Sequence, residues 1–306
     1  MRHILLTFLL FASLGAAEKK QVLLVAGRPS HGPGEHEHNA GVLLLAKCLR
    51  EGAADQVEVT IALNGQWPSD EIIDKADTIL IYSDGGNGHP ALGRLDQLAK
   101  KMAKGCGFVC LHYAVEPAYA CEHWDGKTRP PSPGRGSNGK GAKEFKQWLG
   151  GYFEQHWSVN PFWTADFKQL PDHPVSRGVK PFTSYDEWYF YMRFVDGMKG
   201  ITPTLSAVAG ADTMKRGDGP HSGNPEARAS VAKGESQVVG WAFDRPDGGR
   251  AFGFTGGHIH NAWGNDSQRK VVLNAILWTA KAEVPAGGVE SKVTAEDLKA
   301  NLDKKR

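Results

Sequence analysis

The segment that decides the fold is Gly107-Phe108-Val109-Cys110-Leu111, which is followed directly by His112. This short apolar run is typical of a strand that is buried on both faces of a parallel sheet. Open α/β proteins bind their ligands in the crevice outside the carboxyl ends of such strands. His112 is therefore expected at the place where chemistry is usually done, although a histidine held there only by local hydrogen bonds is the simpler alternative.

Strand and helix patterns alternate before this segment. Strands are predicted over residues 21–26, 57–62 and 78–82, and amphipathic helices over 39–49, with Asn39 as the cap, and over 92–104. Such alternation in short units predicts a doubly wound, mostly parallel sheet with helices on both faces.

The pattern changes after the fourth strand. Residues 121–141 are rich in Gly, Pro, Ser and Lys and predict a long exposed insertion. A helix over 143–153 and a closing helix over 268–282 flank further strands, which are predicted at 163–170, 204–209, 237–243 and 250–255. Residues 244–249 are predicted to be the hairpin turn between the last two strands.

Both ends of the chain differ from this domain. Residues 1–17 combine a short positive start, an apolar stretch and small residues, which is typical of a secretory signal peptide. We therefore expect an exported protein, periplasmic or extracellular, with no membrane contact once the signal is removed. One α/β domain is predicted over residues 18–283, followed over 284–306 by a linker and a charged tail.

Composition narrows the classes of partner and of chemistry. The 306 residues carry a net charge of only +2 and form no basic stripe, so nucleic acid is not an expected partner. Cys48, Cys106, Cys110 and Cys121 form no dense framework; Cys48 and Cys110 are interpreted as buried thiols, and a disulfide involving Cys121 stays open. The sequence leaves the oligomeric state open, with a homo-oligomer possible.

Histidines and carboxylates gather where the predicted strands end. His31, Glu35 and His36 follow the first strand and Asp84 follows the third. His112 and Glu116 follow the fourth strand, and His258 and His260 follow the last. Because the carboxyl ends of parallel strands share one edge of the sheet, these side chains are expected to converge on one crevice.

A metal site is the sharpest interpretation of this convergence. In an extended segment, His258 and His260 would lie on the same face, and His112 would supply a third ligand. Imidazole suits zinc, copper, iron and nickel, and added carboxylates extend the choice to manganese. The alternative is a hydrogen-bonded histidine cluster without a metal.

Carboxylates supply the candidate acids and bases. Glu116, Asp186 and Glu187 are the predicted catalytic residues, because burial can separate the pKa values of such groups. For the Asp186-Glu187 pair, a cap or an ion pair with Arg193 is the alternative. Residues predicted to bind substrate are His31, Glu35, His36, Asp84, His156, Trp157 and Trp263.

Several short motifs resemble the trehalose-utilisation (ThuA-like) family of the class I glutamine-amidotransferase-like superfamily. They are Ser30-His31-Gly32, Leu111-His112-Tyr113, Asp172-His173-Pro174-Val175, Asp186-Glu187-Trp188-Tyr189, Gly249-Arg250-Ala251-Phe252 and Gly257-His258 with Trp263, within residues 21–281. The resemblance implies a flavodoxin-like fold and a role in sugar catabolism, including disaccharides oxidised at a ring hydroxyl. Amidotransferases place a nucleophilic cysteine where His112 falls here and a catalytic histidine near His258, which favours metal binding over thiol chemistry in this chain.

We therefore expect an exported, metal-assisted enzyme whose partner is a small carbohydrate. It would cleave a glycosidic bond of a sugar or keto-sugar by elimination or hydrolysis, or isomerise the sugar, with a divalent zinc, manganese, iron or nickel ion on His112, His258 and His260. One alternative is a non-catalytic carbohydrate-binding or accessory protein. The other is a thiol-dependent, amidotransferase-like hydrolase that uses Cys110 or Cys121.

Overall fold

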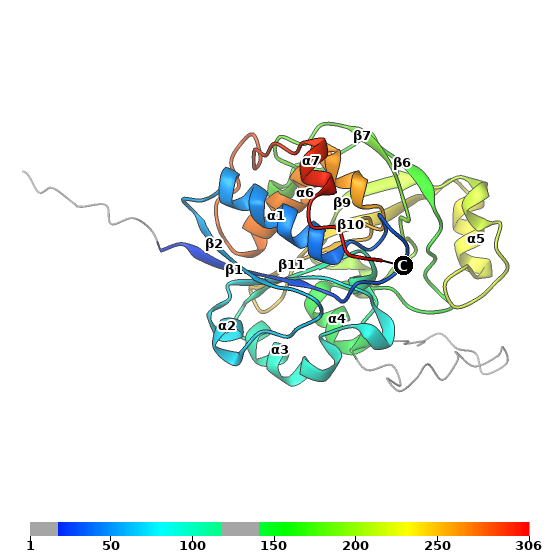
Figure 1. Ribbon diagram of the computed structural model, residues 1–306. Helices are drawn as coiled ribbons and strands as arrows, with labels where there is room; N and C mark the ends of the chain where they lie inside the picture. The colour runs from blue at the N-terminus through cyan, green and yellow to red at the C-terminus, as the bar shows by residue number, and fades with distance from the viewer. Residues whose placement is uncertain (1–17, 118–140, 306) are drawn as a thin grey trace, which may run out of the picture.

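A computed structural model describes residues 18–117 and 141–305 of the chain (Figure 1). The predicted signal peptide, Cys121 and most of the predicted insertion lie outside the described residues.

A seven-stranded sheet forms the centre of the molecule, in the order β2-β1-β3-β4-β11-β10-β9. Its strands are β1 (Lys20–Ala26), β2 (Val57–Ala62), β3 (Thr78–Tyr82), β4 (Gly107–Leu111), β9 (Ile201–Val208), β10 (Ser236–Asp244) and β11 (Arg250–Phe254). The strands from β2 to β11 pair in parallel, whereas β10 pairs antiparallel with both of its neighbours, β11 and β9. The predicted flavodoxin-like, mostly parallel sheet is confirmed, as is the hairpin between the last two strands.

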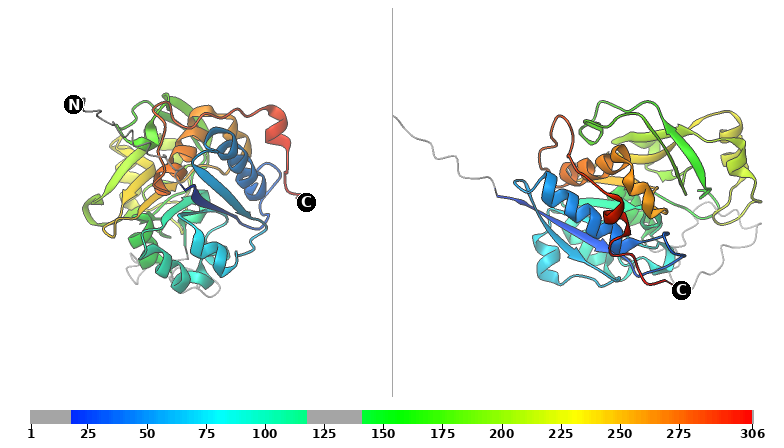
Figure 2. Two further views of the ribbon diagram at one scale, coloured as in Figure 1. Left: turned by 90° about the vertical axis from the view of Figure 1, so that its left-hand side faces the viewer. Right: turned by 45° about the horizontal axis from the view of Figure 1, so that its top comes forward.

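Helices cover both faces of this sheet (Figures 1 and 2). One face carries α1 (His38–Gly52), α6 (Asp266–Thr279) and α7 (Ala295–Lys299), and the other carries α2 (Asp70–Lys75), α3 (Leu95–Met102) and α4 (Ala142–Leu149). Strand β3 shows why the sheet is buried on both sides: Leu80 and Tyr82 pack into the core under α1 and α6, while Ile79 and Ile81 pack into the core under α3 and α4. The remaining helix, α5 (Pro225–Ala232), lies away from both layers (Figure 1).

Two short antiparallel strand pairs lie outside the main sheet, the first of them a hairpin of consecutive strands. They are β6 (Trp163–Phe167) with β7 (Phe182–Asp186), and β5 (Gly151–Tyr152) with β8 (Arg193–Phe194). Single-turn helices are η1 (Gly86–Gly88), η2 (Leu92–Arg94), η3 (His112–Val115), η4 (Pro174–Ser176), η5 (Asp196–Met198), η6 (Ala211–Met214) and η7 (His260–Gly264). Side chains of β7 alternate between buried and exposed, so Asp186 points inward while Tyr185 faces solvent.

Some predicted boundaries were wrong. Helix α1 begins at His38 with Glu37 before it, and Asn39 instead donates its side-chain amide to Asn64 and Asp303. The helix predicted over 143–153 ends at Leu149, because Gly150 adopts a left-handed conformation with φ of 79°. The short elements α2, β7 and α5 were not predicted from the sequence.

The segment after residue 284, expected to be a linker and a charged tail, packs back onto the domain. Val289 is fully buried, and the backbone N–H of Asp303 donates to the Glu37 carboxylate over 2.8 Å. The Lys305 ammonium lies 3.3 Å from the same carboxylate. This segment therefore buttresses the loop that joins β1 to α1. No helix among residues 18–117 and 141–305 is long and apolar enough to cross a membrane.

Candidate functional site

His112 occupies the first position after β4. Its backbone is left-handed, with φ of 55°, a strained conformation for a residue other than glycine that is often found at functional sites. The imidazole is fully buried, and its Nδ1 lies 2.8 Å from the carbonyl oxygen of Thr255. Since a carbonyl only accepts hydrogen bonds, Nδ1 carries the proton, and the bare lone pair is on Nε2.

His36 is held in the same way, in the loop after β1. Its Nδ1 lies 2.6 Å from the Asp84 carboxylate, which follows β3, so Nδ1 donates and Nε2 again carries the lone pair. The two Nε2 atoms of His36 and His112 face each other at 3.0 Å. Two neutral imidazoles oriented in this way present two acceptors to each other and cannot form a hydrogen bond.

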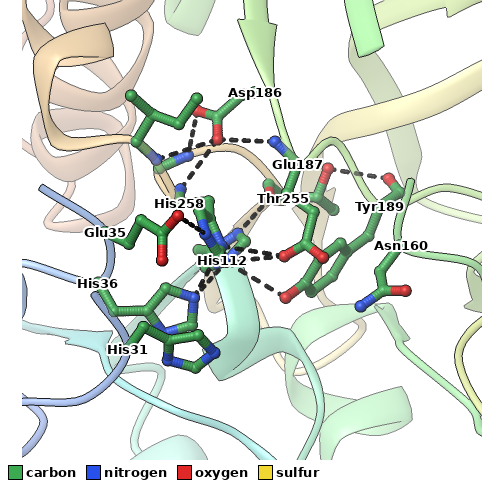
Figure 3. Close-up of polar contacts among 12 residues, drawn as sticks. His31, Glu35, His36, His112, Asn160, Asp186, Glu187, Tyr189, Thr255 and His258 are labelled. Carbon is green, nitrogen blue, oxygen red and sulfur yellow. Dashed lines mark hydrogen bonds and ion pairs between the residues drawn. The ribbon is translucent and has the colours of Figure 1, made fainter. Parts of the chain in front are cut away.

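His258 and Glu187 complete the cluster (Figure 3). His258 Nδ1 lies 2.9 Å from Nε2 of His36 and 3.3 Å from Nε2 of His112. A Glu187 carboxylate oxygen is 3.0 Å from His258 Nδ1 and 3.6 Å from His112 Nε2. All four residues are buried, and the four possible ligand atoms lie within 4.8 Å of one another. Below, these four residues are called the His–Glu cluster.

Electrostatics keep two of these imidazoles neutral. Burial lowers the pKa of His112 and of His36, and neighbouring histidines lower both further. Burial also opposes charge on His258, but the adjacent Glu187 carboxylate outweighs it and raises the pKa of His258. The cluster thus offers two neutral imidazoles, a third imidazole paired with a carboxylate, and that carboxylate itself, and nitrogen and oxygen donors of this kind suit a divalent transition metal.

Asp186 fixes the loop that carries His258. Its buried carboxylate accepts hydrogen bonds from the backbone N–H groups of Glu187, Gly257, His258 and Ile259, over 2.7–3.2 Å. Asp186 therefore acts as a structural anchor, and its oxygens are engaged by the backbone.

A cavity of about 450 Å³ opens onto the cluster. It is lined by His31, Glu35, Tyr113, Asn160, Phe162, Glu187, Tyr189, His221 and His258. The Tyr189 hydroxyl lies 3.2 Å from His112 Nε2, so the cavity reaches the cluster directly. Its size is within the range of small-molecule sites.

The sheet edge brings together most of the residues predicted from the sequence. His31 and Glu35 line the cavity, Asp84 supports His36, and Glu187 joins His112 and His258. His36, expected to bind substrate, takes the place in the cluster that was expected for His260.

Five other predicted residues lie elsewhere. His260 begins η7, outside the cluster, and Trp263 is fully buried against Tyr82 and Phe254. Trp157 packs on Tyr191 and under the Arg193 guanidinium, and neither Trp157 nor His156 lines the cavity. Glu116 is fully buried behind His221. A His-x-His motif predicts a shared face only in an extended strand, and here the chain turns into η7 at His260.

Several cavity residues were not singled out from the sequence. Tyr113 and Tyr189 lie within motifs already noted, and Asn160 closely follows the predicted residues His156 and Trp157, so their proximity to the site could have been inferred. Phe162 precedes β6, and His221 lies in a glycine-rich stretch that resembles an ordinary loop. No local pattern marks either residue.

Comparisons with known proteins agree with this fold. Residues 134–279 match the model of the ThuA family, described as trehalose utilisation. The resemblance predicted from the sequence is confirmed over these residues. The match supports a carbohydrate-related role for this chain.

Two solved structures share its architecture. A ThuA-like protein from Bacteroides uniformis is 14% identical with a TM-score of 0.54, over 88% of this chain and 95% of that one. A ThuA-like protein from Parabacteroides merdae is 15% identical with a TM-score of 0.51, over 91% and 94% of the two chains. At these identities the structures show the fold alone. None of the curated proteins matches the sequence.

Proposed function

We propose that this protein is an exported, metal-assisted enzyme that acts on a sugar or keto-sugar. The reaction would be glycosidic bond cleavage by elimination or hydrolysis, or an isomerisation. One observation carries the proposal: three imidazole nitrogens and a carboxylate oxygen converge at the carboxyl edge of the sheet, and the unprotonated Nε2 atoms of His36 and His112 face each other at 3.0 Å.

A cation between these atoms explains their arrangement. Hydrogen bonds to Asp84 and to the Thr255 carbonyl fix the tautomers of His36 and His112, as outer-shell partners of metal-bound histidines do. Protonating one ring would also remove the conflict between the lone pairs, but burial lowers the pKa of both rings. A divalent metal bound to both Nε2 atoms removes the conflict between their lone pairs without protonating either ring. A bound metal would polarise a carbonyl or hydroxyl oxygen of the substrate.

The cavity fits a carbohydrate. Aromatic faces and edges from Tyr113, Phe162 and Tyr189 stand beside polar groups from Glu35 and Asn160. Sugars present both apolar C–H faces and hydroxyls, so such a mixed lining is suitable for them. The ThuA match is consistent with this substrate class.

The thiol alternative finds little support at Cys110, and Cys121 lies outside the described residues. Cys110 is fully buried in the core under α3 and α4, and burial raises the pKa of its thiol far above the usual value. A nucleophilic cysteine needs a stabilised thiolate and access to substrate. Cys110 has neither.

The metal proposal is tested by elemental analysis of the purified protein, before and after dialysis against a chelator. About one equivalent of a transition metal per chain is expected, and readding the ion to the stripped protein should raise its melting temperature. No bound metal, together with no thermal shift from zinc, manganese, iron or nickel, would contradict the proposal. The binding-protein alternative would then be favoured.

Phe162 offers a test of the substrate class. Among the described residues, Phe162 and Tyr185 are the large aromatic side chains that stay exposed, at 42% and 55%. They stack on each other, and Phe162 also lines the cavity. Phe162→Ala is expected to weaken sugar affinity about 3- to 10-fold, the loss of roughly 1 kcal/mol of aromatic contact. Calorimetry with trehalose and with a keto-disaccharide measures this loss. Val208→Ala, an exposed apolar position on β9, is the control and should bind as the wild type does.

A further inference from the structure

We propose that His221, held by Glu116, is the residue that moves a proton to and from the substrate. This inference rests on the proposed function and adds to it the acid–base group that the His–Glu cluster lacks. The Glu187 carboxylate lies against the nitrogens of His258 and His112 and is thereby part of the cluster. Glu116 is fully buried, so it can act on a substrate only through another group.

His221 is placed to be that group. Its side chain is 28% exposed and lines the same cavity as Glu187 and His258, while its Nε2 lies 3.0 Å from one Glu116 oxygen and 3.3 Å from the other. The Gln155 amide also donates to Glu116, over 3.4 Å. A buried carboxylate behind a cavity-lining imidazole orients the ring and stabilises its protonated form, as in other catalytic pairs.

The pair is linked to the cluster through η3, the single turn that follows β4. The single turn η3 begins at His112 and ends just before Glu116, and the Glu116 carbonyl accepts from the N–H of Gly86 over 2.8 Å. A short span of chain thus carries a proposed metal ligand at one end and the partner of His221 at the other.

The backbone around His221 is equally constrained. Its carbonyl accepts from the N–H of Asn160 over 3.0 Å, and the carbonyl of Pro220 accepts from the N–H of His156 over 2.9 Å. The His221 ring stacks on Phe153, with centroids 5.1 Å apart. These contacts hold the imidazole at a defined angle to the cavity, which proton transfer requires.

The chemistry is a balanced proton relay. Nε2 stays engaged with Glu116, and Nδ1 takes the proton from the carbon next to a keto group of the sugar. The electron pair of that C–H bond moves toward the carbonyl and then expels the glycosidic oxygen, which receives the same proton from Nδ1 as its bond to carbon breaks. The Glu116 carboxylate balances the positive charge that the ring carries between the two steps.

The charges facing His221 agree with this role. Burial lowers the pKa of His221, but the carboxylates of Glu116 and Glu187 outweigh it and raise the pKa, while the Arg216 guanidinium opposes them. The His156 ring, whose own pKa is lowered by burial and by His221, and the Tyr113 ring are further titratable neighbours. Removal of the Glu116 charge should therefore lower the pKa of His221, because the protonated ring loses its main stabilising partner.

The first test does not depend on activity. NMR titration of the metal-loaded protein follows the His221 imidazole, assigned by its loss in His221→Asn. A pKa above that of an ordinary histidine is expected in the wild type, with a drop of about one unit or more in Glu116→Gln. Adding a disaccharide oxidised to a ketone at one ring hydroxyl should shift this resonance. An ordinary pKa that Glu116→Gln leaves unchanged would overturn the inference, whether or not the protein turns over any sugar.

The second test is turnover of the same keto-disaccharide. His221→Asn should lower kcat by at least about 100-fold, with unchanged metal content and partial rescue by added imidazole. Glu116→Gln should also shift the pH profile of kcat. His173→Asn, at a histidine before the η4 turn and outside the cavity, should change neither kcat nor the pH profile. If the wild type binds metal and turns over sugar but His221→Asn is fully active, this inference fails alone. If the wild type neither binds metal nor turns over sugar, the proposed function fails.

Discussion

Replacing His36 or His112 by alanine is expected to abolish metal binding and, with it, turnover. Each change removes one nitrogen from a buried set whose members lie 2.9–3.3 Å apart, and no other imidazole of the described chain joins that set. Loss of an outer-shell partner already costs about 10- to 100-fold in metal affinity, so loss of a ligand should cost more. Metal content and calorimetric titration of the stripped protein with zinc or manganese measure the effect.

A graded series separates ligation from simple damage to the fold. Asp84→Asn keeps the ligand nitrogen of His36, Nε2, but weakens the group that orients its ring, so an intermediate loss of metal affinity of about 10- to 100-fold is expected. His36→Gln is included because it leaves a smaller buried cavity than His36→Ala and is therefore less destabilising. His173→Ala should leave affinity unchanged. Equal metal content in wild type, His36→Gln and His112→Ala would refute the ligand assignment, provided that circular dichroism shows all three folded.

The architecture was predictable because its signal is local. Each buried parallel strand is a short apolar run, as Thr78–Tyr82 and Gly107–Leu111 show, and such runs can be identified without knowledge of their partners. The topological rule then placed the ends of β1, β3, β4 and β11 at one edge. His112, His258 and Asp84 were assigned to the site on this argument alone.

The details of the site depended on contacts that no local pattern records. His260 was expected beside His258, but the chain leaves the extended conformation there and turns into η7. His36 reaches the cluster only because its backbone is left-handed, with φ of 45°, and because Asp84 meets it from a loop 48 residues away. Pairing of His221 with Glu116 spans 105 residues. Such long-range pairs follow from the completed fold.

Replacing Asp186 by alanine is expected to be the most destabilising single change at this edge of the sheet. Its carboxylate accepts from four backbone N–H groups, three of them in the Gly257–Ile259 segment that carries His258. Each buried N–H group left without an acceptor costs about 1–3 kcal/mol. Because water can replace the carboxylate at only some of the four N–H groups, we expect the unfolding free energy to fall by about 4 kcal/mol. Denaturant unfolding of the metal-free protein measures it.

The same change should also weaken metal binding, because the segment that positions His258 loses its anchor. The stability and metal affinity of Asp186→Asn are expected to fall between those of Asp186→Ala and the wild type. The amide oxygen of asparagine still accepts hydrogen bonds, whereas its NH₂ group faces the remaining backbone donors. Asp166→Ala, on the exposed face of β6 in the same hairpin, removes only a surface pair with Lys168 and should change stability by less than about 1 kcal/mol. If Asp186→Ala unfolds as the Asp166 control does and keeps full metal affinity, Asp186 does not hold the loop. In that case the anchoring role of Asp186 would be wrong, and its carboxylate would again be a candidate acid or base for the reaction.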